Sequence, residues 1–217
     1  MKSLHSFALG TLTAALLVGG AVAAPPLYSN GTFNGEINAW NISSFQVADT
    51  FTASANDMVT GVHFFTWDGD GSALTTVDWA IATDNPITDS LSIIASGTAS
   101  GASLTSTFTT VVNSFDYQIY ENTITFAGVT LPSDGGTYWI MLSNANDATA
   151  SLSDFWDQNN GPSIGYQSSN GALPGSQAFD ILGSTVRVPE PTTWALMLAG
   201  FAGLGIALRS RRKLATV

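Results

Sequence analysis

The sequence predicts an all-β fold, and three observations on its central part carry this prediction. Thr, Ser, Val, Ile and aromatic residues dominate there, whereas Lys and Glu are scarce, which is the composition of pleated strands. A period-two alternation of side chains is clear, for example, in Val77–Ile81 and Tyr138–Leu142. No capped amphipathic helix occurs between Tyr28 and Val186. We therefore expect a single antiparallel β-sandwich of jelly-roll type.

Short strand candidates follow one another along this part of the chain, separated by Gly, Asn, Asp and Pro residues that favour turns. The expected strands, in order, are 46–52, 59–67, 77–81, 90–96, 104–112, 115–120, 123–126, 138–142, 151–156 and 179–181. The turn signals include Asp68–Gly71, Asp84–Pro86, Ser133–Gly136 and Asn159–Pro162. Short strands at this spacing are typical of two packed antiparallel sheets.

The N-terminus has the pattern of a secretory signal peptide. Lys2 and His5 precede an apolar stretch over residues 7–18, and the small residues Ala21 and Ala23 follow it. We expect signal peptidase to remove residues 1–23. Residues 24–186 then form one exported domain, and residues 187–217 form a separate C-terminal segment.

The charge distribution of the exported domain is extreme. All six Lys and Arg residues lie outside residues 25–186, and fifteen of the sixteen acidic residues lie inside, so its formal charge is near −15. Nucleic acid and anionic lipid are excluded as partners because binding them requires basic side chains. We expect no internal ion pair, and hence screening by salt, by divalent cations or by a cationic partner. Without cysteine, the domain must be held together by its sheet core.

Three different parts follow one another in the C-terminal segment. Val188-Pro189-Glu190-Pro191 comes first. We expect it to be extended, because each proline disfavours helix in the residue before it. An apolar run without charge follows, and we expect a transmembrane helix over about residues 192–208. A basic tail, residues 209–213, ends the run and stays in the cytoplasm by the positive-inside rule. Its basic residues are Arg209, Arg211, Arg212 and Lys213.

This order of parts resembles the PEP-CTERM protein-sorting segment of Gram-negative bacteria, which is also named ice-binding protein C-terminal domain. The resemblance implies that a membrane-embedded exosortase reads and cuts Val188–Pro191. It implies export across the cytoplasmic membrane, transient anchoring through the helix, and a final place at the cell surface or outside the cell. The alternative is that Pro191 merely begins an ordinary membrane anchor. The resemblance covers the C-terminal segment alone and assigns no activity to the domain before it.

Asp68 and Asp70 form the candidate metal site. Closely spaced carboxylates with glycine turns can direct hard oxygen ligands onto one calcium ion. The segment fails the EF-hand pattern, since Trp79 stands where the twelfth-position Glu should be. A hairpin turn of type I′ or II′ explains Asp68–Gly71 equally well. A second, weaker oxygen cluster comprises Asp154, Asp157 and Asn159.

We expect no enzymatic activity and no catalytic residue. His63 is the only histidine of the exported domain, and it lies in an expected strand, where a packed or surface role is more common than catalysis. With one histidine and no cysteine, a zinc site is not expected. Acidic residues are numerous enough for a glycosidase pair, but nothing in the sequence selects one. A secreted glycan hydrolase therefore remains an alternative.

Aromatic side chains suggest a binding role. Trp67 and Trp156 each stand beside a polar turn, where an exposed indole could stack on a sugar ring. Thr105–Thr110 offers one row of threonines for ice binding, with no repeat to extend it. The primary prediction is an exported surface protein with a structural or adhesive role in an exopolysaccharide layer. A lectin-like carbohydrate-binding module and an ice-binding protein are its alternatives.

Overall fold

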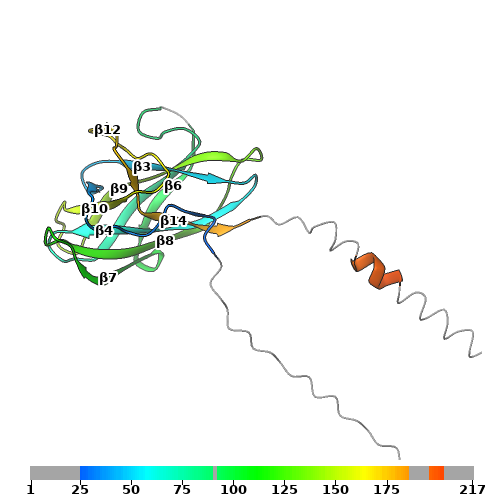
Figure 1. Cartoon of the computed structure of the whole chain (residues 1–217), viewed down its shortest axis with the longest axis horizontal. Coiled ribbons are helices and arrows are strands. Elements are labelled where there is room, and N and C mark those ends of the chain that lie inside the picture. The colour runs from blue at the N-terminus through cyan, green and yellow to red at the C-terminus, as the bar shows by residue number, and fades with distance from the viewer. Residues whose placement is uncertain (1–24, 90–91, 186–195, 203–217) are drawn as a thin grey trace, which may run out of the picture.

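The computed structural model describes residues 25–89, 92–185 and 196–202, and its folded part consists mainly of antiparallel strands (Figure 1). The elements are β1 (Tyr28–Ser29), β2 (Ala39–Asn41), β3 (Val47–Ala53), β4 (Met58–Asp68), β5 (Leu74–Ala82), β6 (Ile93–Ser100), the 3-10 helix η1 (Gly101–Ser103), β7 (Leu104–Val112), β8 (Gln118–Thr130), β9 (Gly136–Asp147), β10 (Asp154–Asn159), β11 (Tyr166–Gln167), β12 (Gly171–Ala172), β13 (Ser176–Gln177) and β14 (Phe179–Ser184). The predicted all-β class is confirmed.

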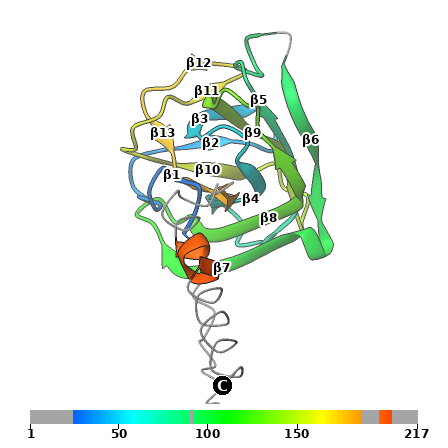
Figure 2. The same cartoon turned by 90° about the vertical axis from the view of Figure 1, so that its right-hand side faces the viewer.

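The strands form two sheets. The six-stranded sheet has the order β12-β11-β3-β9-β5-β6. The eight-stranded sheet is centred on β4, which pairs along its whole length with β8. On the other side of β4, β14 pairs with its first part and β10 with its last three residues. Figure 2 shows the two sheets facing each other across the core.

One cluster of buried side chains from both sheets fills the space between them. Phe51 and Tyr138 come from the six-stranded sheet, and Phe64 comes from the eight-stranded sheet. Trp79 of β5 stacks on Phe126 of β8 with ring centroids 3.8 Å apart, which ties the two sheets together. These inward positions follow the period-two pattern of the strands. Among the described residues, every member of the core clusters lies between residues 27 and 181.

The expected strands 115–120 and 123–126 are corrected to the single strand β8. Residues 113–117 instead form the turn before it. The Asn113 Oδ1 atom accepts hydrogen bonds from the N–H groups of Phe115 and Tyr117, both at 3.0 Å. Asp116 has a left-handed φ of 66° there, which acidic and amide side chains tolerate better than most. Local hydrogen bonds thus outweigh the strand propensity of the two aromatic residues.

Asp68–Gly71 is not a hairpin turn. It follows β4 of the eight-stranded sheet and leads to β5 of the six-stranded sheet, and these two strands do not pair. The segment therefore crosses from one sheet to the other. Its tight local geometry comes from Asp68 itself.

The C-terminal segment is described only over residues 196–202, which are helical and exposed. Within the described residues, no helix combines the length and apolar character needed to cross a membrane. The expected signal peptide, the sorting residues Val188–Pro191, the basic tail and most of the expected helix over 192–208 lie outside the described residues. The domain boundaries remain predictions.

Candidate functional site

A buried carboxylate at the end of β4 organises the turn that follows. The Oδ1 atom of Asp68 accepts hydrogen bonds from the backbone N–H groups of Asp70 at 3.0 Å, of Gly71, and of Ser72 at 2.9 Å. Gly71 has a φ of +78°, which glycine adopts without strain. Asp68 is 1% exposed, and its other oxygen, Oδ2, is buried without a hydrogen-bond partner.

Asp147, the last residue of β9, organises a second turn in the same way. Its Oδ1 accepts hydrogen bonds from the N–H groups of Thr149 and Ser151 at 2.7 and 3.1 Å, and its Oδ2 accepts one from the Ser151 hydroxyl. The Thr149 hydroxyl also donates to Asp70, which links the two turns. One oxygen each of Asp68, Asp70 and Asp147 lies within 4.8 Å of the others.

Asp154, the first residue of β10, adds a fourth carboxylate. Asp154 and Asp68 are direct partners across the β10–β4 ladder, and such partners point to the same face of a sheet. Asp154 is fully buried; its Oδ2 accepts a hydrogen bond from the Ser43 hydroxyl at 3.1 Å. Its Oδ1 is buried and has no hydrogen-bond partner. Two buried, unpartnered carboxylate oxygens therefore come from neighbouring strands.

The four carboxylates are not electrostatically equivalent. Burial, followed by the charges of Asp68 and Asp147, raises the pKa of Asp154 far above its usual range. Burial also raises the pKa of Asp68. The Thr149 hydroxyl lowers the pKa of Asp70, while at Asp147 burial is outweighed by hydrogen bonds that lower the pKa. Two stable anions thus lie beside two buried carboxyl groups that need a proton or a cation.

Asp68, Asp70, Asp147 and Asp154 are called the four-carboxylate cluster below. The chemistry of its donor atoms determines which cation fits it. All its donors are oxygens, and no Lys or Arg occurs between residues 25 and 186 to neutralise them. Ca²⁺ takes six to eight oxygen ligands in flexible geometry, whereas structural zinc prefers cysteine and histidine. The residues present fit Ca²⁺.

The sequence prediction found half of this cluster. Asp68 and Asp70 lie together as expected. Asp147 and Asp154 were missed as partners, because they are 79 and 86 positions from Asp68 in the sequence. The only available signal was that both stand at turns beside hydroxyl residues.

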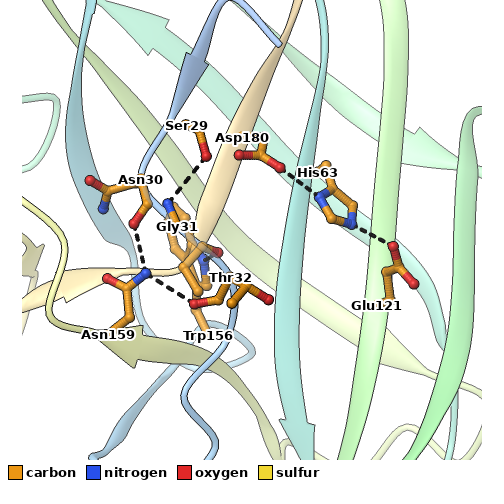
Figure 3. Close-up of polar contacts among 10 residues, drawn as sticks. Ser29, Asn30, Gly31, Thr32, His63, Glu121, Trp156, Asn159 and Asp180 are labelled. Atoms are coloured by element: carbon orange, nitrogen blue, oxygen red, sulfur yellow. Dashed lines mark hydrogen bonds and ion pairs between the residues drawn. The ribbon is translucent and has the colours of Figure 1, made fainter. Parts of the chain in front are cut away.

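The second oxygen cluster expected from the sequence does not form. Asp154 joins Asp68 instead. Asp157 accepts hydrogen bonds from two backbone N–H groups of the loop before β2 and from Nε1 of Trp67. The Asn159 side chain donates to the carbonyl oxygens of Asn30 at 2.7 Å and Thr32 at 3.2 Å (Figure 3). Asp157 and Asn159 thus fasten the N-terminal loop to β10.

The predicted glycan platform is wrong at both of its positions. Trp156 is fully buried, and its Nε1 donates to the Ala178 carbonyl at 3.0 Å. Trp67 is 6% exposed, and its Nε1 donates to the buried Asp157. Neither indole offers a ring face to a sugar. The polar residues that follow Trp67 and Trp156 form hydrogen bonds within the domain, and the two indole rings are buried.

His63 forms the polar contacts drawn in Figure 3. Its Nδ1 lies 3.1 Å from the Asp180 carboxylate and its Nε2 lies 2.8 Å from the Glu121 carboxylate. When His63 is protonated these contacts are ion pairs, so the expectation of no internal ion pair is wrong. Both ring nitrogens face carboxylates and neither faces a hydroxyl nucleophile, which differs from a Ser-His-Asp arrangement.

In the described part of the chain, the threonine row that begins at Thr105 does not continue across the eight-stranded sheet. Thr105 of β7 lies opposite Thr123 of β8, but Thr123 lies opposite His63 of β4, and His63 lies opposite Asp180 of β14. The row across the sheet thus changes from two threonines to a histidine and an acid. This argues against a flat ice-binding surface there.

The C-terminal segment matches a known protein-family model. No curated protein matches the chain. A family model described as the PEP-CTERM protein-sorting motif matches residues 187–213. Such a motif marks an exported protein sorted by an exosortase, which agrees with an acidic, cysteine-free β domain. The suspected resemblance is confirmed: the chain carries a PEP-CTERM protein-sorting motif at its C-terminal end.

Proposed function

We propose that the protein is a structural or adhesive component of an extracellular polysaccharide layer. The sorting motif at residues 187–213 supports this role, because it directs the domain out of the cell. The domain adds a disulfide-free sheet core and about fifteen carboxylates, which suit a hydrated matrix rich in divalent cations. The test is fractionation of the producing bacterium with an antibody to the domain. The protein should be found in the matrix fraction, and its deletion should weaken the layer; an unchanged layer would contradict the proposal.

Processing in this proposal takes place at both ends of the chain. Signal peptidase removes residues 1–23, the helix over about 192–208 anchors the precursor, and the basic tail holds it on the cytoplasmic side. Exosortase then cuts near Val188–Pro191 and releases the domain to the surface.

The second part of the proposal is that the four-carboxylate cluster binds Ca²⁺. The observation that carries it is the pair of buried carboxylate oxygens without a partner, on Asp68 and Asp154. Each unpaired buried oxygen destabilises the folded domain unless a proton or a cation satisfies it. One Ca²⁺ would satisfy both oxygens and would also bridge the two turns that Asp70 and Asp147 occupy. An extracellular site of this kind is expected to bind Ca²⁺ with a Kd of about 0.1–1 mM.

The calcium proposal is tested on residues 24–186, which contain every described strand and the whole described core. With a Kd of about 0.1 mM, 10 mM CaCl₂ should add about 2.7 kcal/mol, or roughly 5–10 °C in Tm. Mg²⁺ at equal concentration is the control for screening. Equal, gradual effects of the two ions would contradict a specific site.

A substitution sharpens this test because its effect should reverse sign. In EDTA, Asp154→Asn removes a buried carboxyl group with a strongly raised pKa, so it should stabilise the domain at pH 8. In 10 mM CaCl₂ it should destabilise the domain relative to the parent, because a ligand is lost. Asp134→Asn is the matched control, since Asp134 is exposed. A calcium response that survives Asp154→Asn would contradict the assignment of Asp154.

We also propose that the sandwich is a jelly roll. Two strand orders support this connectivity: β3-β9-β5-β6 in one sheet and β1-β14-β4-β8 in the other. Consecutive long strands repeatedly change sheet, as at β3–β4, β4–β5 and β8–β9. A jelly roll, built of two Greek keys, has such crossings. β7 is then an additional strand between β6 and β8.

A second candidate function, glycan binding, is favoured by a shallow groove on the outer face of the six-stranded sheet. Met141 forms part of its apolar floor, and Gln46, Asp78 and Asn144 line it. Trp139, half-buried, packs against this floor. Apolar and polar groups in this combination suit a sugar ring. A glycan array with the parent and Trp139→Ala decides: binding that is lost in the variant supports the lectin-like role, and no binding by the parent contradicts it.

We propose no catalytic activity for the domain. The two opposed carboxyl groups, Asp68 and Asp154, are both buried, whereas a glycosidase pair must flank a substrate. Incubation with the polysaccharide of the producing cells should release no reducing sugar. Release of sugar would favour the hydrolase alternative.

A further inference from the structure

Two long strands form the open edges of the two sheets. Within the described residues, β7 pairs only with β8, and β6 pairs only with β5. They are consecutive in the chain and are joined by η1, so both edges lie on one side of the sandwich (Figure 2). The strands that end the sheets elsewhere are β1 and β13 in the eight-stranded sheet and β12 in the six-stranded sheet, with two residues each. Long unpaired backbone is thus concentrated on the β6–β7 side.

This side lacks charge in a domain that is otherwise strongly acidic. No Asp, Glu, Lys or Arg occurs from residue 90 to residue 115, and Asp89 and Asp116 flank the stretch. Natural edge strands are usually protected by charged residues, by proline or by short length. Over Leu104–Phe108, β7 has none of these devices, and its pairing with β8 is regular there.

Exposed apolar side chains gather at the end of the same strand. Phe108, Val111, Val112 and Phe115 are between 37% and 57% exposed. A bulge separates Phe108 from Val112, where Thr110 has a left-handed φ of 69°. The strand therefore offers a regular pairing segment followed by an apolar patch.

The carboxylate nearest to the middle of β7 is already paired. Glu121 lies opposite Thr107 across the β7–β8 ladder, and its Oε1 lies 2.8 Å from Nε2 of His63. The only histidine of the exported domain thus lies beside the acidic residue that faces the middle of β7. The Glu36 carboxylate, which accepts hydrogen bonds from Ser114, lies beyond the end of the strand.

We propose that β7 pairs antiparallel with β7 of a second copy of the protein, so that the eight-stranded sheets of two copies become continuous. A two-fold axis makes such an edge self-complementary, since each copy presents the same strand to the other. The charge distribution favours a second copy, rather than a cationic protein, as the partner that pairs with β7. A cationic partner would be drawn to the acidic remainder of the domain, whereas two acidic copies can approach closely only where their carboxylates are absent.

The absence of cysteine from the chain makes a direct test possible. Thr105→Cys and Thr107→Cys each introduce one exposed thiol into β7 of the full chain, expressed and exported by its own cells. Thr52→Cys is the control, because Thr52 is also exposed but lies in β3 of the other sheet, where it pairs with Thr137 of β9. Under mild oxidation, one of the β7 variants should form a disulfide-linked dimer in several-fold greater yield than the control. Dimer yields equal to the control, or cross-links to other proteins alone, would overturn the proposal.

Disulfide cross-linking can capture transient encounters between copies, so a reversible measurement of dimer formation is also needed. In sedimentation of residues 24–186, the parent should dimerise, and the dimer should become tighter with NaCl as repulsion between the acidic domains is screened. Thr107→Asp should raise the dimer Kd by about tenfold or more, because it places two like charges at the pairing edge. Thr52→Asp adds the same charge in the other sheet, away from β7, and should leave the Kd within about twofold of the parent once salt screens it. A monomeric parent, or equal effects of the two substitutions, would overturn the proposal.

Discussion

Folding stability should fall as pH rises from 4 to 7, because two aspartates outside the four-carboxylate cluster are buried in the core. Burial raises the pKa of Asp49 to about 6, against backbone hydrogen bonds from Gln177 and Thr50 that lower it. Burial likewise raises the pKa of Asp157 to about 6, against hydrogen bonds that include one from Trp67. Both carboxyl groups thus bind a proton more tightly in the folded domain than in the unfolded chain.

The size of the effect follows from the shift. A rise from 3.8 to about 6 corresponds to about 3 kcal/mol for each residue, since one pKa unit is worth about 1.4 kcal/mol. At these two positions the folded state holds more protons between pH 3.8 and 6, so the contribution of Asp49 and Asp157 to the free energy of unfolding falls across that window and levels off above it. For one residue this amounts to roughly 6–12 °C in Tm. Without calcium, Asp154, whose pKa is raised by burial to about 8, extends the fall to higher pH.

Two groups act in the opposite direction, but at lower pH. The pKa values of Asp70 and Asp147 lie below 3.8 in the folded domain, so their contribution is present above pH 3.8 and is lost only in stronger acid. The domain should therefore be most stable near pH 4, on the acid side of the range in which most proteins have their maximum.

The assay is urea denaturation of residues 24–186 in EDTA, followed by tryptophan fluorescence from pH 3.5 to 8. Asp49→Asn keeps the shape of the side chain and one acceptor oxygen but cannot titrate, so about 3 kcal/mol of the fall between pH 4 and 6.5 should disappear. Asp134→Asn, at an exposed position, should leave the profile unchanged. A free energy of unfolding that is flat or rises from pH 4 to 6.5 would refute the reasoning, as would an Asp49→Asn profile equal to that of the parent.

Two further substitutions test the C-terminal segment and the sheet geometry. Replacing both Pro189 and Pro191 by Ala should restore helix propensity before the apolar run and leave uncut precursor in the membrane on an immunoblot; normal processing would contradict the recognition role. Gly61→Ala should destabilise the domain by roughly 1–3 kcal/mol, because its Cβ would lie 2.3 Å from the backbone oxygen of Ile124. Gly128→Ala is the control, since its Cβ would meet only the flexible Met58 side chain, and an equal loss would contradict this reading.

The long strands could be predicted from sequence because they are rich in β-branched and aromatic residues and long enough to display a period of two. Val77–Ile81 and Tyr138–Leu142 lie inside β5 and β9. The short strands could not be predicted, since β1, β11, β12 and β13 have only two residues each and cannot display a period. They pair because longer strands lie beside them. Local competition explains the error at Phe115, where the Asn113 side chain captures backbone N–H groups that a strand would have used.

The candidate site shows a different limit of sequence reasoning. Asp68 and Asp70 could be recognised as a pair because both carboxylates lie in one turn, whereas Asp147 and Asp154 come close to them only through the pairing of distant strands. A buried aspartate is also difficult to foresee: alternation places Asp49 inward between Val47 and Phe51, although the side chain is acidic. The predicted exposure of Trp67 and Trp156 is wrong for a related reason. Polar neighbours in the sequence indicate an exposed side chain only when those neighbours face solvent.

The absence of basic residues connects these buried acids to the charge of the whole domain. In most proteins a buried carboxylate can be neutralised by Lys or Arg, but between residues 25 and 186 His63 is the only residue that could act in this way. His63 is already held by Glu121 and Asp180 on the outer face of the eight-stranded sheet. Where hydrogen bonds do not offset burial, the carboxyl group therefore favours a proton or a metal ion from outside the chain. These carboxyl groups are those of Asp49, Asp68, Asp154 and Asp157. Stability of such a domain depends on the medium into which it is exported, and mild acid and calcium should each stabilise it when supplied alone.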